Sequence, residues 1–94
     1  MSKTPAFTAK PVVLTIGETD FTFTPGVIEA NNYSNEVMPD NKVVPAYNYL
    51  TRSVKSEQKD ELIALLDTVP HLVMELYGMV SSNAKGDIVI TLKN

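Results

Sequence analysis

Apolar and polar residues alternate with a period of two in two neighbouring stretches near the start of the chain. The stretch 12–16 reads VVLTI and the stretch 21–24 reads FTFT, with the turn-forming residues 17–20 (GETD) between them. Because successive side chains of a β-strand point to opposite faces, each stretch presents one apolar face. The pattern therefore predicts an antiparallel β-hairpin.

A third alternating stretch lies near the end of the chain. Ile88, Ile90 and Leu92 alternate with Val89 and Thr91, directly after the helix-stopping segment AKGD. An isolated two-stranded hairpin is marginally stable in water, so a further strand beside it is expected. The sequence predicts that this third strand pairs with the hairpin.

Between the hairpin and the third strand, apolar residues recur at intervals of three and four, and prolines divide this region into segments. Pro39 and Pro70 mark breaks, because proline cannot continue a helical hydrogen-bond ladder. Pro45 is compatible with the first turn of a helix, where backbone donors have no intrahelical partner. Four helices are expected, over about residues 25–37, 43–54, 56–69 and 70–83.

These elements together predict an α+β fold. A three-stranded antiparallel sheet, made of the N-terminal hairpin and the C-terminal strand, packs on three to four helices in the order ββααααβ. Residues 1–11 contain two prolines and form an extended lead-in, and residues 12–94 form a single domain. A domain of this size buries roughly 60–65% of its unfolded surface, which predicts marginal stability.

The second expected helix has one apolar and one polar side. Val43, Tyr47, Leu50 and Val54 follow one another at intervals of four, three and four residues, which predicts a buried stripe. The other side is expected to be exposed, and it carries Asn48, Tyr49, Arg52 and Lys55.

The fourth expected helix is apolar over most of its circumference. Met74 and Tyr77 widen its apolar stripe well beyond one face. A helix of this kind is either covered completely by its own domain or keeps a face for a partner. Methionine adapts its shape to a partner, and Gly78 permits close approach of another backbone, so both readings stay open.

Charge argues against nucleic-acid binding. The 94-residue chain has a formal net charge of -3, and its eight basic residues are dispersed along the sequence. Arg52, Lys55 and Lys59 are neighbours, but acidic residues are interleaved with them, which is typical of a solvated helix face. We expect no nucleic-acid partner.

Catalytic and metal-binding patterns are missing from the sequence. The chain has no cysteine, which excludes disulfides and thiolate chemistry, and it has one histidine, His71, without a local catalytic partner. The longest apolar run is far shorter than the ~18 residues that a membrane span requires. We therefore expect a cytosolic protein that is not an enzyme, with no cofactor, no metal and no membrane contact.

The segment YSNEVMPDNKVVPAYNYLTRSV, residues 33–54, preceded by the hairpin LTIGETDFTFTP, resembles a family of small phage tail assembly chaperones. The similarity extends over most of the chain. Its most specific parts are the hairpin leading into FTFTP, the segment NKVVPAYNYL and the closing stretch DIVITLK. None of these parts is a catalytic signature, so the resemblance concerns the overall pattern.

The resemblance implies a protein of the host cytoplasm that coats the apolar, helical tape measure protein while the tail tube polymerises, and that is absent from the mature virion. Further partners that it implies are the tail tube protein and a second copy of the chain. A minor structural or completion protein of the phage particle, or a small host-directed binding module, would share the lack of catalytic chemistry. The expected partner-binding groove consists of Tyr47, Asn48, Tyr49, Arg52, Met74 and Tyr77.

Overall fold

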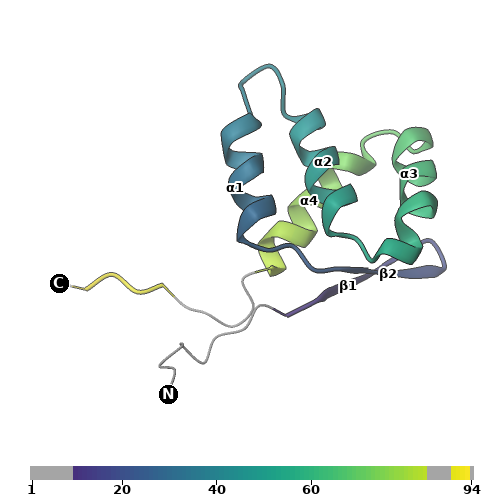
Figure 1. Ribbon diagram of the computed structural model, residues 1–94, viewed down its shortest axis with the longest axis horizontal. Helices are drawn as coiled ribbons and strands as arrows, with labels where there is room; N and C mark the ends of the chain where they lie inside the picture. Colours follow the sequence, from purple (N-terminus) through teal and green to yellow (C-terminus); the bar gives the residue numbers. More distant parts are fainter. Residues whose placement is uncertain (1–9, 85–89, 94) are drawn as a thin grey trace.

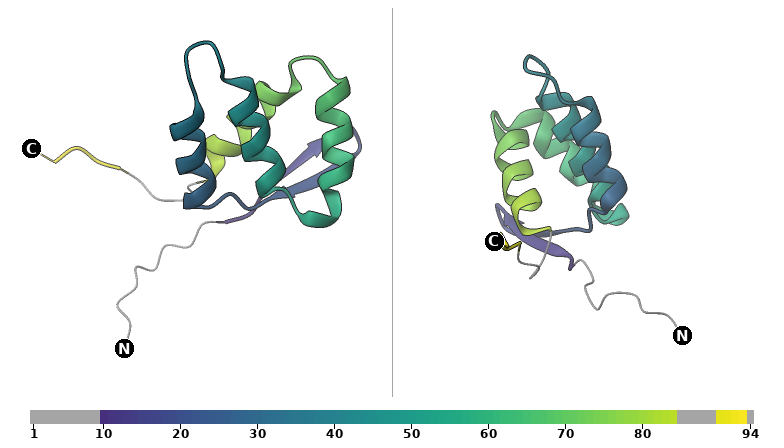
Figure 2. Two further views of the ribbon diagram at one scale, coloured as in Figure 1. Left: turned by 45° about the horizontal axis from the view of Figure 1, so that its top comes forward. Right: turned by 90° about the vertical axis from the view of Figure 1, so that its left-hand side faces the viewer.

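The computed structural model describes residues 10–84 and 90–93, which form a β-hairpin followed by helices (Figure 1). The elements are β1 (Val12–Ile16), β2 (Thr19–Phe23), α1 (Val27–Glu36), α2 (Val43–Ser53), the 3-10 helix η1 (Ser56–Gln58), α3 (Lys59–Thr68) and α4 (Leu72–Asn83). The hairpin lies across one end of the helices, α1 and α2 stand side by side, and α4 crosses behind them (Figures 1 and 2). The expected lead-in, residues 1–11, lies outside the described residues except for its last two.

The predicted hairpin is confirmed. β1 and β2 pair antiparallel, and Ile16 faces Thr19 at the closed end, which leaves a two-residue loop of Gly17 and Glu18. Gly17 has a φ of 67°, whereas Glu18 does not have a positive φ. A positive φ at the first loop position alone defines a type II′ turn, whose twist matches that of the flanking strands.

The predicted third strand, and with it the order ββααααβ, is wrong. Among the described residues the sheet has two strands, and the observed order is ββαααα. Ile90 and Leu92 are 85% and 83% exposed and belong to no strand, while Ile88 and Val89 lie outside the described residues. The expectation failed because the hairpin gains its support from the helices and from the chain after α2.

The chain that follows α2 closes the outer edge of β2. The backbone N–H of Thr24 donates to the carbonyl of Ser53 at 2.8 Å, and the N–H of Lys55 donates to the carbonyl of Thr22 at 2.8 Å. Phe23 and Val54 form an isolated antiparallel bridge at the same place. These contacts satisfy edge groups that a further strand would otherwise satisfy.

Gln58 completes this edge with its side-chain amide. Its Oε1 accepts a hydrogen bond from the N–H of Thr22 at 3.0 Å, and its Nε2 donates to the carbonyl of Asp20 at 2.6 Å. The amide therefore binds β2 as a residue of a neighbouring strand would. This contact joins η1 to the hairpin over a long separation in sequence.

Gln58→Ala is expected to destabilise the domain by about 1–2 kcal/mol, because two backbone groups of β2 lose their partner. Gln58→Glu should cost at least as much, since a carboxylate oxygen would face the carbonyl of Asp20. Urea unfolding followed by circular dichroism measures both. The control is Glu57→Ala on the same 3-10 helix, which should shift stability by less than about 0.5 kcal/mol. Equal effects of Gln58→Ala and Glu57→Ala would contradict the role of the amide.

The core lies between the hairpin and the helices. Phe21, Phe23, Leu50, Leu62 and Val80 are fully buried, so β2 and three of the helices contribute to it, and β1 adds the buried Val12. Phe21, Phe23 and Leu50 came from apolar positions that the periodicity had selected. Burial of such side chains is the main favourable term in the folding of a domain of this size.

The four predicted helices are confirmed, with differences at their starts. α1 begins after Gly26, and the third expected helix divides into η1 and α3. Pro70 precedes the start of α4 and is not its first residue, because His71 adopts a left-handed conformation with a φ of 67°. This residue reverses the chain direction between α3 and α4 within a very short connection.

Candidate partner-binding groove

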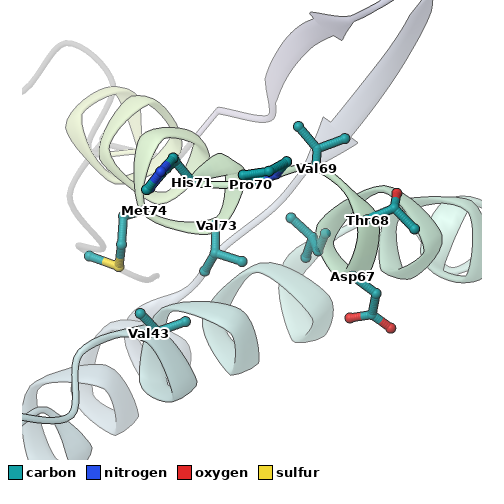
Figure 3. Close-up of a pocket in the computed structure, with 9 residues that line it drawn as sticks. Val43, Asp67, Thr68, Val69, Pro70, His71, Val73 and Met74 are labelled. Atoms are coloured by element: carbon teal, nitrogen blue, oxygen red, sulfur yellow. The ribbon is translucent and has the colours of Figure 1, made fainter.

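An open groove of about 410 Å³ lies between the start of α2 and the turn that joins α3 to α4 (Figure 3). Val43 lies on one side of it, and Val73 and Met74 of α4 lie on the other. The remaining lining residues are Leu66, Asp67, Thr68, Val69, Pro70 and His71.

The groove forms because apolar residues stand at helix ends that the neighbouring described helices do not cover. Val43 is 53% exposed at the first position of α2, and Val69 is 41% exposed directly after α3. Met74 is partly buried on the first turn of α4. Exposed apolar side chains gathered on concave walls are typical of sites that bind another polypeptide.

A polar pair stands at one side of the groove. Asp67 lines it, and the nearby Tyr47 of α2 lies one turn after Val43. Partial burial, and after it the negative charge of Asp67, raises the pKa of Tyr47 above its ordinary value. Asp67 is exposed and so remains available to a positively charged group of a partner.

Three tyrosines from three helices form a second feature beside the groove. The ring of Tyr33 on α1 stacks on Tyr77 of α4, with centroids 4.3 Å apart. Tyr49 of α2 meets Tyr77 edge to face at 4.9 Å and Tyr33 at 6.4 Å. Such pairs stabilise by about 0.5–1.5 kcal/mol beyond the burial of their area. The tyrosine cluster, Tyr33, Tyr49 and Tyr77, therefore joins α1, α2 and α4.

The tyrosine cluster should make the domain sensitive to alkali. Burial, and then the neighbouring Tyr77 and Glu29, raises the pKa of Tyr49 to about 12. Because this pKa is about 10 in the unfolded chain, the stability that the neutral ring provides is complete below pH ~10 and is lost as the pH rises toward 12. We expect a loss on the order of 2 kcal/mol over this range, measured by urea unfolding at fixed pH. Tyr49→Phe should remove most of this pH dependence, and an unchanged dependence would contradict the assignment.

The structure divides the six predicted site residues into three places. Met74 lines the groove and Tyr47 lies near Asp67 without lining it, while Tyr49 and Tyr77 belong to the tyrosine cluster. Arg52 faces α1, where its Nη1 lies 3.9 Å from Oε2 of Glu36. Asn48 precedes Arg52 by one helical turn and is partly buried.

The expectation that Tyr49 lies on the exposed side of the second helix is wrong, since this residue is only 4% exposed. The buried side of α2 is Ala46, Tyr49, Leu50 and Ser53, displaced by about one residue from the predicted stripe. The hydroxyl of Ser53 donates to the carbonyl of Tyr49 at 2.7 Å, so the buried polar group is satisfied. α2 is flanked by both α1 and α4, which the periodicity of α2 alone cannot indicate.

Sequence reasoning missed Val43, Val69 and Val73 as groove residues. It assigned Val43 to a buried stripe, although this residue lies at the first position of α2. Apolar residues that flank a helix break such as Pro70 are the signal that could have indicated an open groove. Within the described residues, no group of three or more metal-ligating side chains occurs.

A second concavity, of about 300 Å³, lies between β1 and α4. Leu14, Ile16, Leu72 and Met79 contribute apolar surface to it, and Glu75 adds the only charge. Met79 is 48% exposed there. None of the six predicted residues lines this second groove, which makes it a natural control surface.

The fold and the apolar groove define a small α+β protein whose described surface is suited to binding another polypeptide. A family model described as phage tail assembly chaperone matches residues 12–94. The chain is also 34% identical, over 83 residues, to an 11.3 kDa protein encoded in the lys 3′ region of Haemophilus phage HP1, covering 88% of this chain and 80% of the relative. No solved structure matches the chain.

The chain therefore belongs to the phage tail assembly chaperone family, as its resemblance to that family predicted. None of the helices in the described part of the chain is long and apolar enough to cross a membrane.

Proposed function

We propose that this protein binds the tape measure protein of its phage and keeps it soluble in the host cytoplasm until the tail tube polymerises around it. The bound segment is an amphipathic helix whose apolar side lies in the groove between α2 and the α3–α4 turn. The protein is then released and is absent from the mature virion. The proposal requires no catalytic step and no cofactor.

The single observation that supports this proposal best is the open apolar groove in a protein of the tail assembly chaperone family. Val43 and Val69 keep much of their apolar surface in contact with water. Burying apolar surface contributes roughly 25 cal/mol per Å², so an amphipathic helix can gain affinity there without specific hydrogen bonds. A small interface of this kind gives modest affinity, which suits a chaperone that must later dissociate.

Charge indicates the kind of helix that fits. Asp67 lines the groove and is exposed, and the whole chain has a net charge of -3. A basic residue beside the apolar side of the partner helix would lie near Asp67. Such rim charges contribute mainly to specificity and to the rate of association.

Co-expression of the chain with the tape measure protein of the same phage tests the proposal. The expected result is that the tape measure protein remains soluble and co-purifies with the chain, whereas alone it aggregates. Mass spectrometry of purified virions should then detect the tape measure protein and not the chaperone. A chain that is present in virions at fixed stoichiometry would instead be a structural or completion protein.

A further inference from the structure

Helix α1 packs against α2 from the surface of the domain. None of its ten residues is buried, and Val27 and Ile28 at its start are 74% and 71% exposed. Its N-cap residue, Gly26, has no side chain to cap the first turn, and the carboxylate of Glu29 accepts a hydrogen bond from the N–H of Gly26 at 2.7 Å. Its interior contains asparagine and serine, which are weak helix formers. α1 therefore depends on its neighbours for its stability.

α1 packs along α2, where the ring of Tyr33 meets Tyr49 edge to face at 6.4 Å. The ring of Tyr33 stacks on Tyr77 at 4.3 Å. Glu36 lies 3.9 Å from Arg52, with 42% and 48% of these side chains exposed, and an ion pair in water contributes little. The ring of Tyr33 is thus the principal apolar attachment of α1.

The surface beneath α1 is continuous with the groove. Met74 and Tyr77 lie three residues apart on α4, so they share one face of that helix. Met74 lines the open groove, whereas Tyr77 is covered by Tyr33. This face of α4 is therefore open to solvent at Met74 and is covered by α1 one turn later, at Tyr77.

We propose that α1 is a displaceable cover, and that the partner helix replaces it on α2 and α4. This inference rests on the proposed function and extends it by naming the surface that is used. In the free protein, Tyr33 occupies the position that a large apolar side chain of the partner takes in the complex. Displacement of α1 lengthens the groove from Met74 to Tyr77, uncovers Tyr49 and separates Arg52 from Glu36.

The residues beneath α1 specify the chemistry of the replacing helix. An aromatic or large aliphatic side chain would lie between Tyr49 and Tyr77, where Tyr33 lies now. An acidic residue about one turn away would take the place of Glu36 beside Arg52. Together with a basic residue near Asp67, these positions describe an amphipathic helix with opposite charges toward its two ends.

Hydrogen exchange on the isolated protein tests the cover itself. Tyr33→Ala should raise exchange of the α1 amides by about tenfold or more, while the amides of α2 and α4 keep their protection. Ile28→Ala, at an exposed position of the same helix, should leave these rates within about twofold. If Tyr33→Ala accelerates α2 and α4 as much as α1, then α1 is an integral part of the core and the inference is overturned.

Exchange in the complex with the wild-type chain tests the replacement. The expected result is faster exchange in α1, residues 27–36, and slower exchange in α2 and α4 when the tape measure protein is bound. Slower or unchanged exchange in α1 would show that the partner binds without displacing it, which overturns the inference and leaves the proposed function intact. The absence of any complex would overturn the proposed function and this inference with it.

Discussion

Replacement of Phe23 by alanine is expected to destabilise the domain by about 3–5 kcal/mol, a large part of the stability of a chain of this size. Phe23 has no exposed surface, and it lies where β2 meets the end of α2 at Val54. Its removal leaves a cavity between the hairpin and the helices that the close-packed surroundings fill only in part. Urea unfolding monitored by circular dichroism measures the change.

Two variants of the same hairpin serve as controls for Phe23→Ala. Phe23→Leu keeps most of the buried volume and should cost less than about 2 kcal/mol. Val13→Ala, at a position of β1 that is 56% exposed, should change stability by less than about 0.5 kcal/mol. A loss below about 1 kcal/mol for Phe23→Ala would show that the hairpin does not pack on the helices as described.

Met74→Glu is expected to lower the amount of co-purified tape measure protein by a factor of about ten or more, which corresponds to about 1.4 kcal/mol of binding free energy. The groove is open and apolar, so a charge there must lose water when the partner helix binds. In the free protein the carboxylate remains hydrated, because the groove is open to solvent. We therefore expect a change in folding stability below about 1 kcal/mol.

Met79→Glu is the matched control, because it places the same charge on the same helix but in the second groove, beside β1. It should leave co-purification of the tape measure protein within about twofold of the wild-type chain. If Met79→Glu abolishes co-purification and Met74→Glu does not, the partner binds between β1 and α4 instead. If Met74→Glu unfolds the chain, as circular dichroism would show, Met74 belongs to the core.

The candidate site could be predicted only in part, for reasons that particular residues make clear. Met74 was identified because it widened the apolar stripe of α4 beyond one face, and the structure places it at the open groove. Tyr49 was taken for a surface residue, because the periodicity of α2 gives the direction of each side chain but not the position of the neighbouring helices. Val43 was taken for a core residue, although the described part of the chain leaves it 53% exposed at the start of α2.

The sequence by itself determined the hairpin, the four helices, the absence of cysteine chemistry and the family. Each of these depends on local patterns: alternation of period two, apolar spacing of three and four, turn-forming Gly17 and helix-breaking Pro39. Only the tertiary structure decided that the described C-terminal residues 90–93 do not extend the sheet, that η1 closes the edge of β2, and that α1 covers the tyrosines. These outcomes depend on contacts between residues far apart in the chain. Several surfaces of the chain can compete for the same partner, and the local sequence pattern does not show which of them packs there.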